Sequence, residues 1–454
     1  MQNHSLTEGS VLKKLLLFAL PILGANLLQA LYGTVDLMIV GLFTEASEVS
    51  AVSTGSMTMQ TITGIVIGLT MGCTVLLGNS IGMKDYKKAS RAVGSSALLF
   101  VAVGVLLTGI IVALAGPIST VMNAPKEAFD QTKTYITICG LGVICIVIFN
   151  ALSGIFRGIG DSKTPLILMA ISCGCNIVGD LLLVGVFSMG SAGAAIATVA
   201  AQGISVVSAF GMIKKNGFGF ETDKAYLKPA KAETALILKY GLPIAAQELL
   251  TGVSFMVILA ILNGFGLIAS AGVGVAEKIC GLMFIVPGAM IAAVSAFSAQ
   301  NVGAGLHNRA KKGMFYGMAV TVLIGLGMFA VSFTNGAWLA HFFAKDEAVC
   351  AAAADYLKSY SIDCVIVGFN FCMMGYLNGN GKTGFVALQG ILSTFLVRIP
   401  FSYAMSKIEG VSLFQVGFAT PLATVFAIIL TTAYVVRFEK KQAKERAKPR
   451  LDLE

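Results

Sequence analysis

Long apolar runs make up most of the chain, and short polar or Gly/Pro-containing breaks separate them. Each run has roughly 20–30 residues, enough for a helix to cross the hydrocarbon core of a bilayer. Lipid offers no hydrogen bonds to the backbone, so spanning segments must be helices or closed barrels. The short alternating segments of a barrel are not seen. The pattern predicts an all-α membrane protein with twelve transmembrane helices. The expected spans are 13–43, 51–81, 91–116, 129–156, 164–187, 192–213, 234–262, 270–299, 311–334, 349–377, 383–405 and 411–437.

Composition supports this interpretation. Only 12% of the 454 residues are charged and 56% are hydrophobic, whereas a soluble domain has about a quarter charged residues. Twelve spans leave no room for a separate soluble domain. The polar start, Lys13 and Lys14 are followed by an apolar run too long for a signal peptide, so we expect the first span to direct insertion.

The basic residues predict the orientation. With the N-terminus inside, 25 of the 32 Lys and Arg residues fall on cytoplasmic segments and five on outside loops. Positive charge is retained on the cytoplasmic side of membrane proteins. We therefore expect a multi-pass protein of the cell (inner) membrane with both termini in the cytoplasm. The net charge of +9 is explained by topology and by attraction to membrane lipids, and no nucleic-acid partner is expected.

The chain repeats itself. Leu20-Pro21-Ile22 returns as Leu242-Pro243-Ile244, 222 positions later, and the stretch from Gly160 to Thr164 returns from Gly379 to Thr383, 219 positions later. Two six-helix lobes follow. Because six is even, both enter the membrane in the same sense and are related by a pseudo-two-fold axis along the membrane normal. The predicted division is an N-lobe (1–213), a cytoplasmic linker (214–233), a C-lobe (234–437) and a basic tail (438–454).

Two aspartates lie inside predicted spans of the N-lobe. An ionisable group at this depth is costly and marks a functional site by default. Asp36 follows Pro21, which should bend the first span. Asp180 lies four residues after Asn176, so their oxygens share a helix face. Two carboxylates without a basic partner in their half favour binding of a proton or cation; the other interpretation is that neighbouring donors hold them and they only fix helix packing.

Other polar residues are weaker candidates. Thr198, on a span that begins with small residues suited to close packing, and Asn150 could add neutral oxygens to the same pocket. Glu248 could instead reach the membrane interface, and Arg398 could be structural or a counter-ion for a carboxylate of the C-lobe. Methionines such as Met283 and Met290 suit an adaptable cavity, although such residues also occur in ordinary helix packing.

No enzyme signature is present. The chain has no phosphate-binding loop ending in Gly-Lys-Ser/Thr, its three histidines have no paired acids nearby in sequence, and its nine cysteines have no metal-ligand spacing. We expect no enzymatic activity and no cofactor, so the energy for transport would come from an ion gradient.

Several motifs together resemble the multidrug and toxic compound extrusion (MATE) family. They are Pro21 with Val35-Asp36 and Val40-Gly41, the stretch Arg157–Pro165, Asn176 with Asp180, Gly193–Thr198, and Ala299–Gly305. The resemblance covers essentially the whole chain. It implies a twelve-helix, two-lobed antiporter that exports organic cations and amphipathic drugs in exchange for sodium ions or protons.

The resemblance also implies a site. The N-lobe site of the DinF-like branch falls on Asp36, Asn176, Asp180 and Thr198, which would hold a proton or Na⁺, with Asn150 and Tyr32 nearby. NorM-like members carry a tenth-span carboxylate, which Val367–Phe371 lacks, so the N-lobe is expected to carry coupling alone. The candidate substrate-contacting residues are Gln29, Tyr32, Glu248, Met283 and Met290.

The sequence is also compatible with two other functions. One is a lipid-linked precursor flippase of the same superfamily, which would line its cleft with arginines; only Arg398 lies well inside a span. The other is a membrane scaffold without transport, for which two acids in the lipid core would have little use. The chain is expected to act as a monomer.

Overall fold

The computed structural model describes residues 5–220 and 226–447. Part of the predicted linker (221–225) and the end of the predicted tail (448–454) lie outside the described residues. The described part is all-α, with no strand, and contains twelve helical segments long and apolar enough to cross a membrane. The predicted fold class is confirmed, and the protein is a multi-pass membrane protein.

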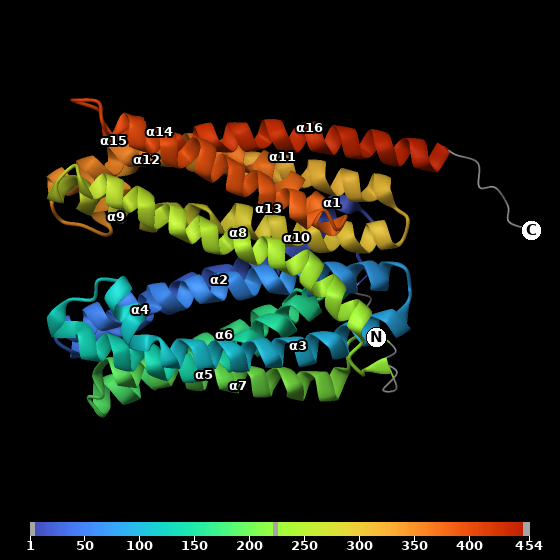
Figure 1. Ribbon diagram of the computed structural model, residues 1–454, viewed down its shortest axis with the longest axis horizontal. Coiled ribbons are helices and arrows are strands. Elements are labelled where there is room, and N and C mark those ends of the chain that lie inside the picture. Colours follow the sequence, from blue (N-terminus) through green and yellow to red (C-terminus); the bar gives the residue numbers. More distant parts are fainter. Residues whose placement is uncertain (1–4, 221–225, 448–454) are drawn as a thin grey trace, which may run out of the picture. The chain divides into compact units, whose positions relative to one another are not determined.

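Most of the helical spans are longer than the apolar runs that predict them, because their polar ends extend the hydrogen-bonded backbone beyond the lipid core. They are shown in Figure 1. The first half contains α1 (Val11–Phe43), α2 (Ala46–Gly82), α3 (Tyr86–Ala113), α4 (Ala115–Val121), η1 (Lys126–Ala128), α5 (Phe129–Ile159), α6 (Lys163–Asp180), η2 (Leu181–Val186) and α7 (Gly190–Asn216). The second half contains α8 (Lys231–Asn263), α9 (Leu267–Met283), α10 (Ile285–Gly303), α11 (His307–His341), α12 (Glu347–Gly379), α13 (Thr383–Leu392), η4 (Ser393–Arg398), α14 (Ile399–Met405), α15 (Leu413–Gly417) and α16 (Ala419–Ala447).

The chain forms two compact units. Unit 1 comprises residues 1–249, 292–313 and 379–381, and unit 2 comprises residues 250–291, 314–378 and 382–454. This division does not follow the repeat. The end of α10 and the start of α11, which belong to the second half of the sequence, pack within unit 1.

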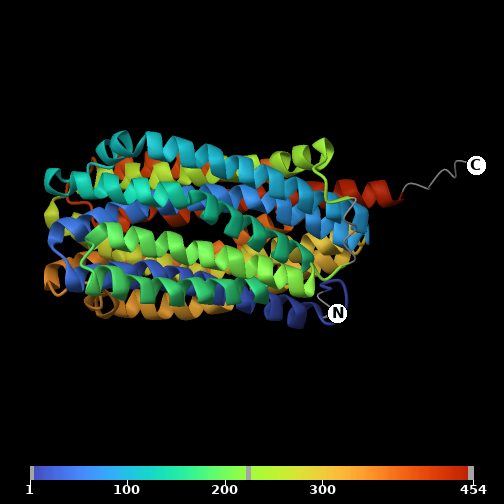
Figure 2. The same ribbon diagram turned by 90° about the horizontal axis from the view of Figure 1, so that it is seen from below.

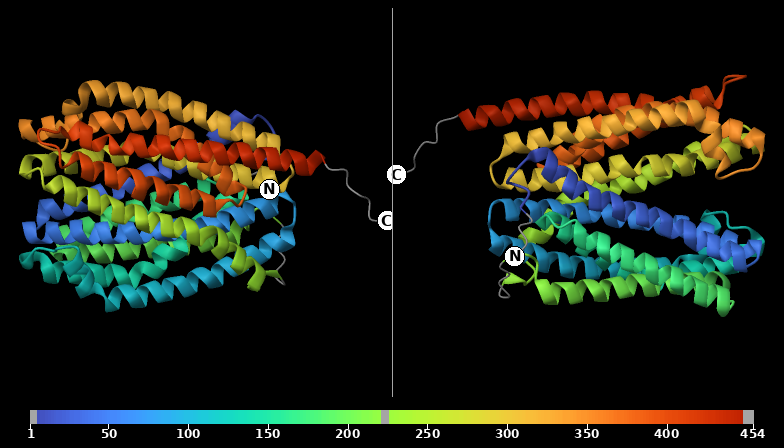
Figure 3. Two further views of the ribbon diagram at one scale, coloured as in Figure 1. Left: turned by 45° about the horizontal axis from the view of Figure 1, so that its top comes forward. Right: turned by 180° about the vertical axis from the view of Figure 1, so that it is seen from behind.

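Unit 1 is built around α5. This helix contacts α2, α3 and α7, and α6 packs between α7 and α1; α1 runs across α6 in the right-hand view of Figure 3. Figure 2 shows the same helices from below. The α5–α6 connection is short because Gly160 adopts a left-handed conformation (φ 92°) that ends α5. Asp161 then accepts hydrogen bonds from the backbone N–H groups of Lys163 and Thr164 at 3.0 Å and caps α6.

In unit 2, η4 packs against α13, α14 and α16. The predicted eighth span is two helices, α9 and α10, which meet at Phe284. Pro287 lies in the first turn of α10, where the missing N–H costs nothing.

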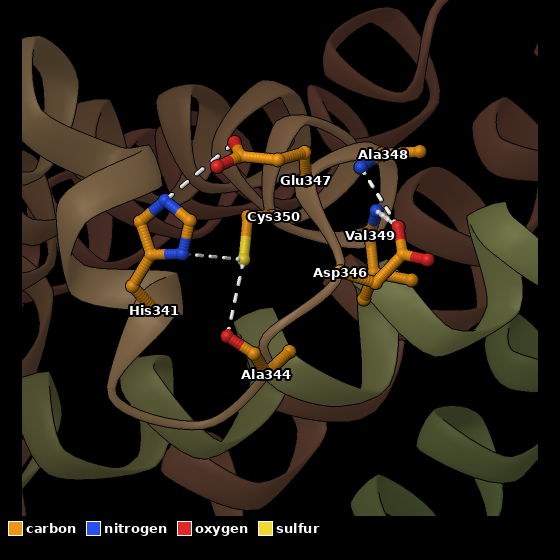
Figure 4. Close-up of polar contacts among 7 residues, drawn as sticks. All are labelled: His341, Ala344, Asp346, Glu347, Ala348, Val349 and Cys350. Atoms are coloured by element: carbon orange, nitrogen blue, oxygen red, sulfur yellow. Dashed lines mark hydrogen bonds and ion pairs between the residues drawn. The ribbon is translucent and has the colours of Figure 1, made fainter.

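The α11–α12 turn of unit 2 is held by local contacts, which Figure 4 shows. Asp346 Oδ1 accepts hydrogen bonds from the N–H groups of Ala348 and Val349 at 2.8 and 3.1 Å and so caps α12. The His341 ring lies between Glu347, at 3.7 Å, and the Cys350 sulfur, at 3.3 Å. These contacts fix the start of α12, which carries Asp363 further along.

Candidate functional site

A cavity of about 380 Å³ opens in unit 1. Its wall includes Asp36 and Tyr32 from α1, Asn150 from α5 and Thr198 from α7. Asp36 is 2% exposed although α1 as a whole is one of the least covered helices. The helix continues through Pro21 without a break, so the predicted bend at this residue stays a prediction.

Asp180 is the last residue of α6 and is completely buried. The chain then widens into the π-helical segment η2, and single π-helical turns occur frequently at functional sites. Close packing of α6 against α7 places Asn176, one turn before Asp180, beside Thr198. A Cβ on Gly179 would come within 2.9 Å of the Ala197 Cβ, which is the kind of small-residue contact predicted for this span.

The carboxyl groups of Asp36 and Asp180 interact directly with each other. Within the described residues, Asp36 Oδ1 and both carboxyl oxygens of Asp180 receive no hydrogen bond and are shielded from solvent. Two adjacent carboxylates repel each other when both are ionised, and burial removes the water that would screen them. Both carboxyl groups can therefore be ionised at low cost only when a positive species lies beside them.

Neutral oxygens surround the pair. Asn176 donates from Nδ2 to Thr198 Oγ1 at 3.5 Å, and its own Oδ1 is buried without a donor among the described residues. The Tyr32 hydroxyl faces Thr198. Asn150 donates from Nδ2 to the Ile146 carbonyl at 2.8 Å and lines the cavity. Oxygen ligands of this kind suit a hard cation.

The structure thus brings together Asp36, Asn176, Asp180 and Thr198, with Asn150 and Tyr32 on the same cavity. Gln29 also lines the cavity, whereas Glu248, Met283 and Met290 do not. Glu248 is exposed on α8, and the two methionines are buried in unit 2. These three residues are not part of the wall of this cavity, so their contact with a substrate stays a prediction.

The sequence reasoning missed the contribution of α2. Ser56, Met59, Gln60, Thr63 and Ile67 all line the cavity. The polar members recur at steps of four and three residues, which is the spacing of one helix face. A polar stripe on an apolar span was the available signal.

A second polar cluster was also missed. Asp363 lies in α12, one turn before the Val367–Phe371 stretch that lacks a carboxylate, and is 1% exposed. It lies within electrostatic reach of Arg398, as does Glu277. A tenth-span carboxylate is therefore present in unit 2, at a position other than the one the resemblance indicates.

Comparisons with known proteins identify the family. The MatE family model matches the chain twice, at residues 21–182 and 243–404. The two matches have equal length and are 222 positions apart, the offset seen between Pro21 and Pro243.

Curated relatives cover nearly the whole chain. The probable multidrug resistance protein YpnP of Bacillus subtilis is 26% identical over 407 residues, which is 89% of this chain and 91% of YpnP. The multidrug export protein MepA of Staphylococcus aureus is 23% identical over 416 residues, 90% of this chain and 91% of MepA.

Among solved structures, an outward-facing conformation of a multidrug resistance MATE family transporter superposes with a TM-score of 0.90. It is 20% identical, and the match covers 98% of this chain and 99% of that one. This likeness supports the fold. The two matches of the family model cover most of the sequence, and the chain therefore belongs to the MatE family of transporters.

Proposed function

We propose that this protein is a secondary active antiporter that exports organic cations and amphipathic drugs in exchange for H⁺ or Na⁺ by alternating access. It acts in the cell (inner) membrane, with both termini in the cytoplasm, as a monomer among membrane lipids. One observation carries this proposal: Asp36 lines a cavity large enough for a small molecule, and its carboxyl group interacts directly with that of Asp180, whose two oxygens have no hydrogen-bond donor among the described residues.

The cavity lining supports a cationic cargo. It contains the carboxylate of Asp36 and no lysine or arginine. Tyr135, Phe149 and Met59 supply aromatic and thioether surface, and aromatic faces attract organic cations. A flippase that holds a pyrophosphate group would need basic residues here, so the lining disfavours that alternative. A scaffold would have no need of the cavity.

Coupling follows from competition for the two carboxylates. A proton or Na⁺ that binds the Asp36–Asp180 pair neutralises it and lowers the cost of keeping it away from water. The same negative charge attracts a cationic drug, so the ion and the drug compete. Each ligand shifts the conformational equilibrium only through its different affinity for the two states.

The test is drug efflux from proteoliposomes under separately imposed proton and sodium gradients. Wild-type protein should export under at least one gradient, and Asp36→Asn and Asp180→Asn should abolish the dependence on that gradient. Asp130→Asn is the matched control, because Asp130 is exposed at the start of α5. Wild-type export rates from both site variants would contradict the proposal.

A further inference from the structure

The second half of the chain does not repeat the acidic site. The offset of the repeat is 222 at Pro21 and Pro243 and 219 at Gly160 and Gly379, so Asp36 corresponds to Ile258 and Asp180 to Ile399. Arg398 directly precedes this Ile399 in the sequence. The region equivalent to the N-terminal acid pair has thus lost both acids and gained a permanent positive charge.

Arg398 is buried within unit 2, where it is 7% exposed. It ends the π-helical segment η4, as Asp180 adjoins η2. Its Nη2 donates to the Tyr360 hydroxyl at 2.8 Å, and its guanidinium lies 4.3 Å from the centre of the Phe255 ring. These contacts hold the cation in place, while its Nε has no partner among the described residues.

Two acids from other helices supply negative charge to this position. Asp363 comes from α12 and Glu277 from α9, and both interact electrostatically with Arg398. Neither acid forms a direct ion pair with Arg398 among the described residues. Asp363 Oδ1 and Glu277 Oε1 are both buried without a donor there. Each of the three groups thus keeps an unsatisfied polar atom.

The charges of this cluster do not balance. Arginine stays protonated under all relevant conditions, so two ionised acids would leave one unpaired negative charge inside the membrane-spanning region. A buried unpaired charge is strongly unfavourable. One more positive species must bind when both acids are ionised, and the guanidinium already present repels a metal cation at such short range.

We infer that unit 2 carries a second ionisable site, the Asp363–Glu277–Arg398 cluster, which takes one proton and excludes metal cations. The inference rests on the proposed function only in linking this proton to transport. The sites of the two halves then differ in the ions that they bind. The N-terminal site accepts a proton or a metal cation, and the C-terminal site accepts a proton alone.

The surroundings of the cluster fit this assignment. The other titratable groups that face it are Cys280 on α9 and Tyr356, Tyr360 and Cys364 on α12. The α16 helix contributes neutral hydroxyls only, Thr420 beside Tyr360 and Thr424 beside Asp363. Lys278, adjacent in sequence to Glu277, is exposed. No further fixed charge among the described residues facing the cluster balances the second acid.

Infrared difference spectroscopy of the full-length protein in vesicles tests the inference without measuring transport. The background is Asp36→Asn with Asp180→Asn, which removes the N-terminal acids. A step from neutral to acidic pH should still produce a buried carboxylic-acid band, and added NaCl should not change it. Thiols and phenols do not absorb at this band, so its origin is confined to carboxyl groups.

Variants within the cluster then identify the band. Asp363→Asn and Glu277→Gln should each abolish it, because Arg398 balances the remaining acid. Arg398→Gln should keep the band and make it sensitive to Na⁺, whereas Arg398→Lys should keep it insensitive. Glu347→Gln is the control, since Glu347 lies on the same helix with an 89% exposed side chain; Figure 4 shows it at the start of α12.

Three results would overturn the inference: absence of the band in the background protein, survival of the band in both acid variants, or sensitivity to Na⁺ with Arg398 in place. The proposed function fails separately, through drug efflux by Asp36→Asn and Asp180→Asn at the wild-type rate. The carboxylic-acid band therefore tests the inference whether or not the efflux experiment supports the proposed function.

Discussion

Asp36 on α1 and Asp180 at the end of α6 lie 144 positions apart in sequence and direct their carboxyl groups at each other inside unit 1. Neither helix supplies a basic residue to neutralise them at the cavity. In the proposed mechanism the pair is one binding site rather than two, since any proton or cation bound by one carboxylate changes the charge felt by the other.

This relationship predicts that substitutions of the two aspartates have non-additive effects on the efflux rate. Asp36→Asn and Asp180→Asn should each reduce gradient-driven efflux, and the double variant should be no slower than the slower single variant, because residues that act as a unit are not additive. The measurement is the initial efflux rate of the four proteins in proteoliposomes. Independent, multiplicative losses would show that the carboxylates act at separate steps.

The neutral oxygens offer a way to distinguish the coupling ions. Thr198→Val keeps the shape of the side chain and removes the oxygen that accepts from Asn176. If Na⁺ is the coupling ion, loss of one ligand should raise the half-saturating Na⁺ concentration by about tenfold, which corresponds to about 1.4 kcal/mol. Proton-driven efflux should change little, because carboxylates alone bind protons.

The control for this variant is Thr137→Val, which removes an exposed hydroxyl that bonds only to its own helix in the structure. An unchanged Na⁺ dependence of Na⁺-driven efflux in Thr198→Val would remove Thr198 from the ion site.

The sequence predicted the twelve spans well because hydrophobic length is decided by the bilayer, a constraint that acts on each helix separately. It also predicted the set around Asp36 and Asp180, because acids in apolar spans are conspicuous and Asn176 is one turn away. The sequence did not identify the polar residues of α2 that line the cavity, which are Ser56, Gln60 and Thr63. Ser and Thr often hydrogen-bond to their own helix in apolar spans, and only the fold shows which of them face a cavity.

The resemblance could not indicate Asp363, because this chain places its tenth-span acid one turn before the position at which NorM-like members carry theirs. The partners of Asp363 come from α9, η4 and α16, which are remote in sequence. No local spacing joins Glu277, Asp363 and Arg398, so their proximity emerges only from tertiary packing.

Glycines set the packing of α2 against the end of α10 in unit 1. A Cβ on Gly82 would lie 2.0 Å from the Gln300 carbonyl oxygen, and one on Gly303 would lie 2.2 Å from the Asn79 carbonyl oxygen. Gly82→Ala should therefore force the helices apart and destabilise the protein by about 1–3 kcal/mol, the usual cost of overpacking. A lower thermal midpoint in detergent measures this loss.

Gly109→Ala on α3 is the matched control, because nothing lies within 4 Å of the added carbon. It should leave stability unchanged or raise it slightly, since alanine has the higher helix propensity. Equal midpoints for the Gly82 and Gly109 variants would argue against close contact between α2 and α10.

The segment from Leu6 to Gly9 is fastened to the start of α11 in unit 1. The Arg309 guanidinium donates to the carbonyls of Leu6, Glu8 and Gly9, at 3.3, 2.9 and 2.6 Å. Leu6 is 3% exposed, and its N–H donates to Gln300 Oε1 at 3.1 Å. Two separate nitrogens of the planar guanidinium reach these three carbonyls, and a lysine, whose donors all lie on one nitrogen, cannot reproduce this arrangement.

Arg309→Lys should therefore release this segment although the charge is kept. We expect faster hydrogen–deuterium exchange at the Leu6 amide and its neighbours, by about tenfold if the lost contacts contribute about 1.4 kcal/mol to local opening. Exchange in the core of α5 should stay the same. Lys312→Ala, which alters an exposed charge on the same helix, is the control. Asn301 Nδ2 also donates to the Leu6 carbonyl, at 3.3 Å. Unchanged exchange at Leu6 in Arg309→Lys would mean that Gln300 and Asn301 hold the segment without the arginine.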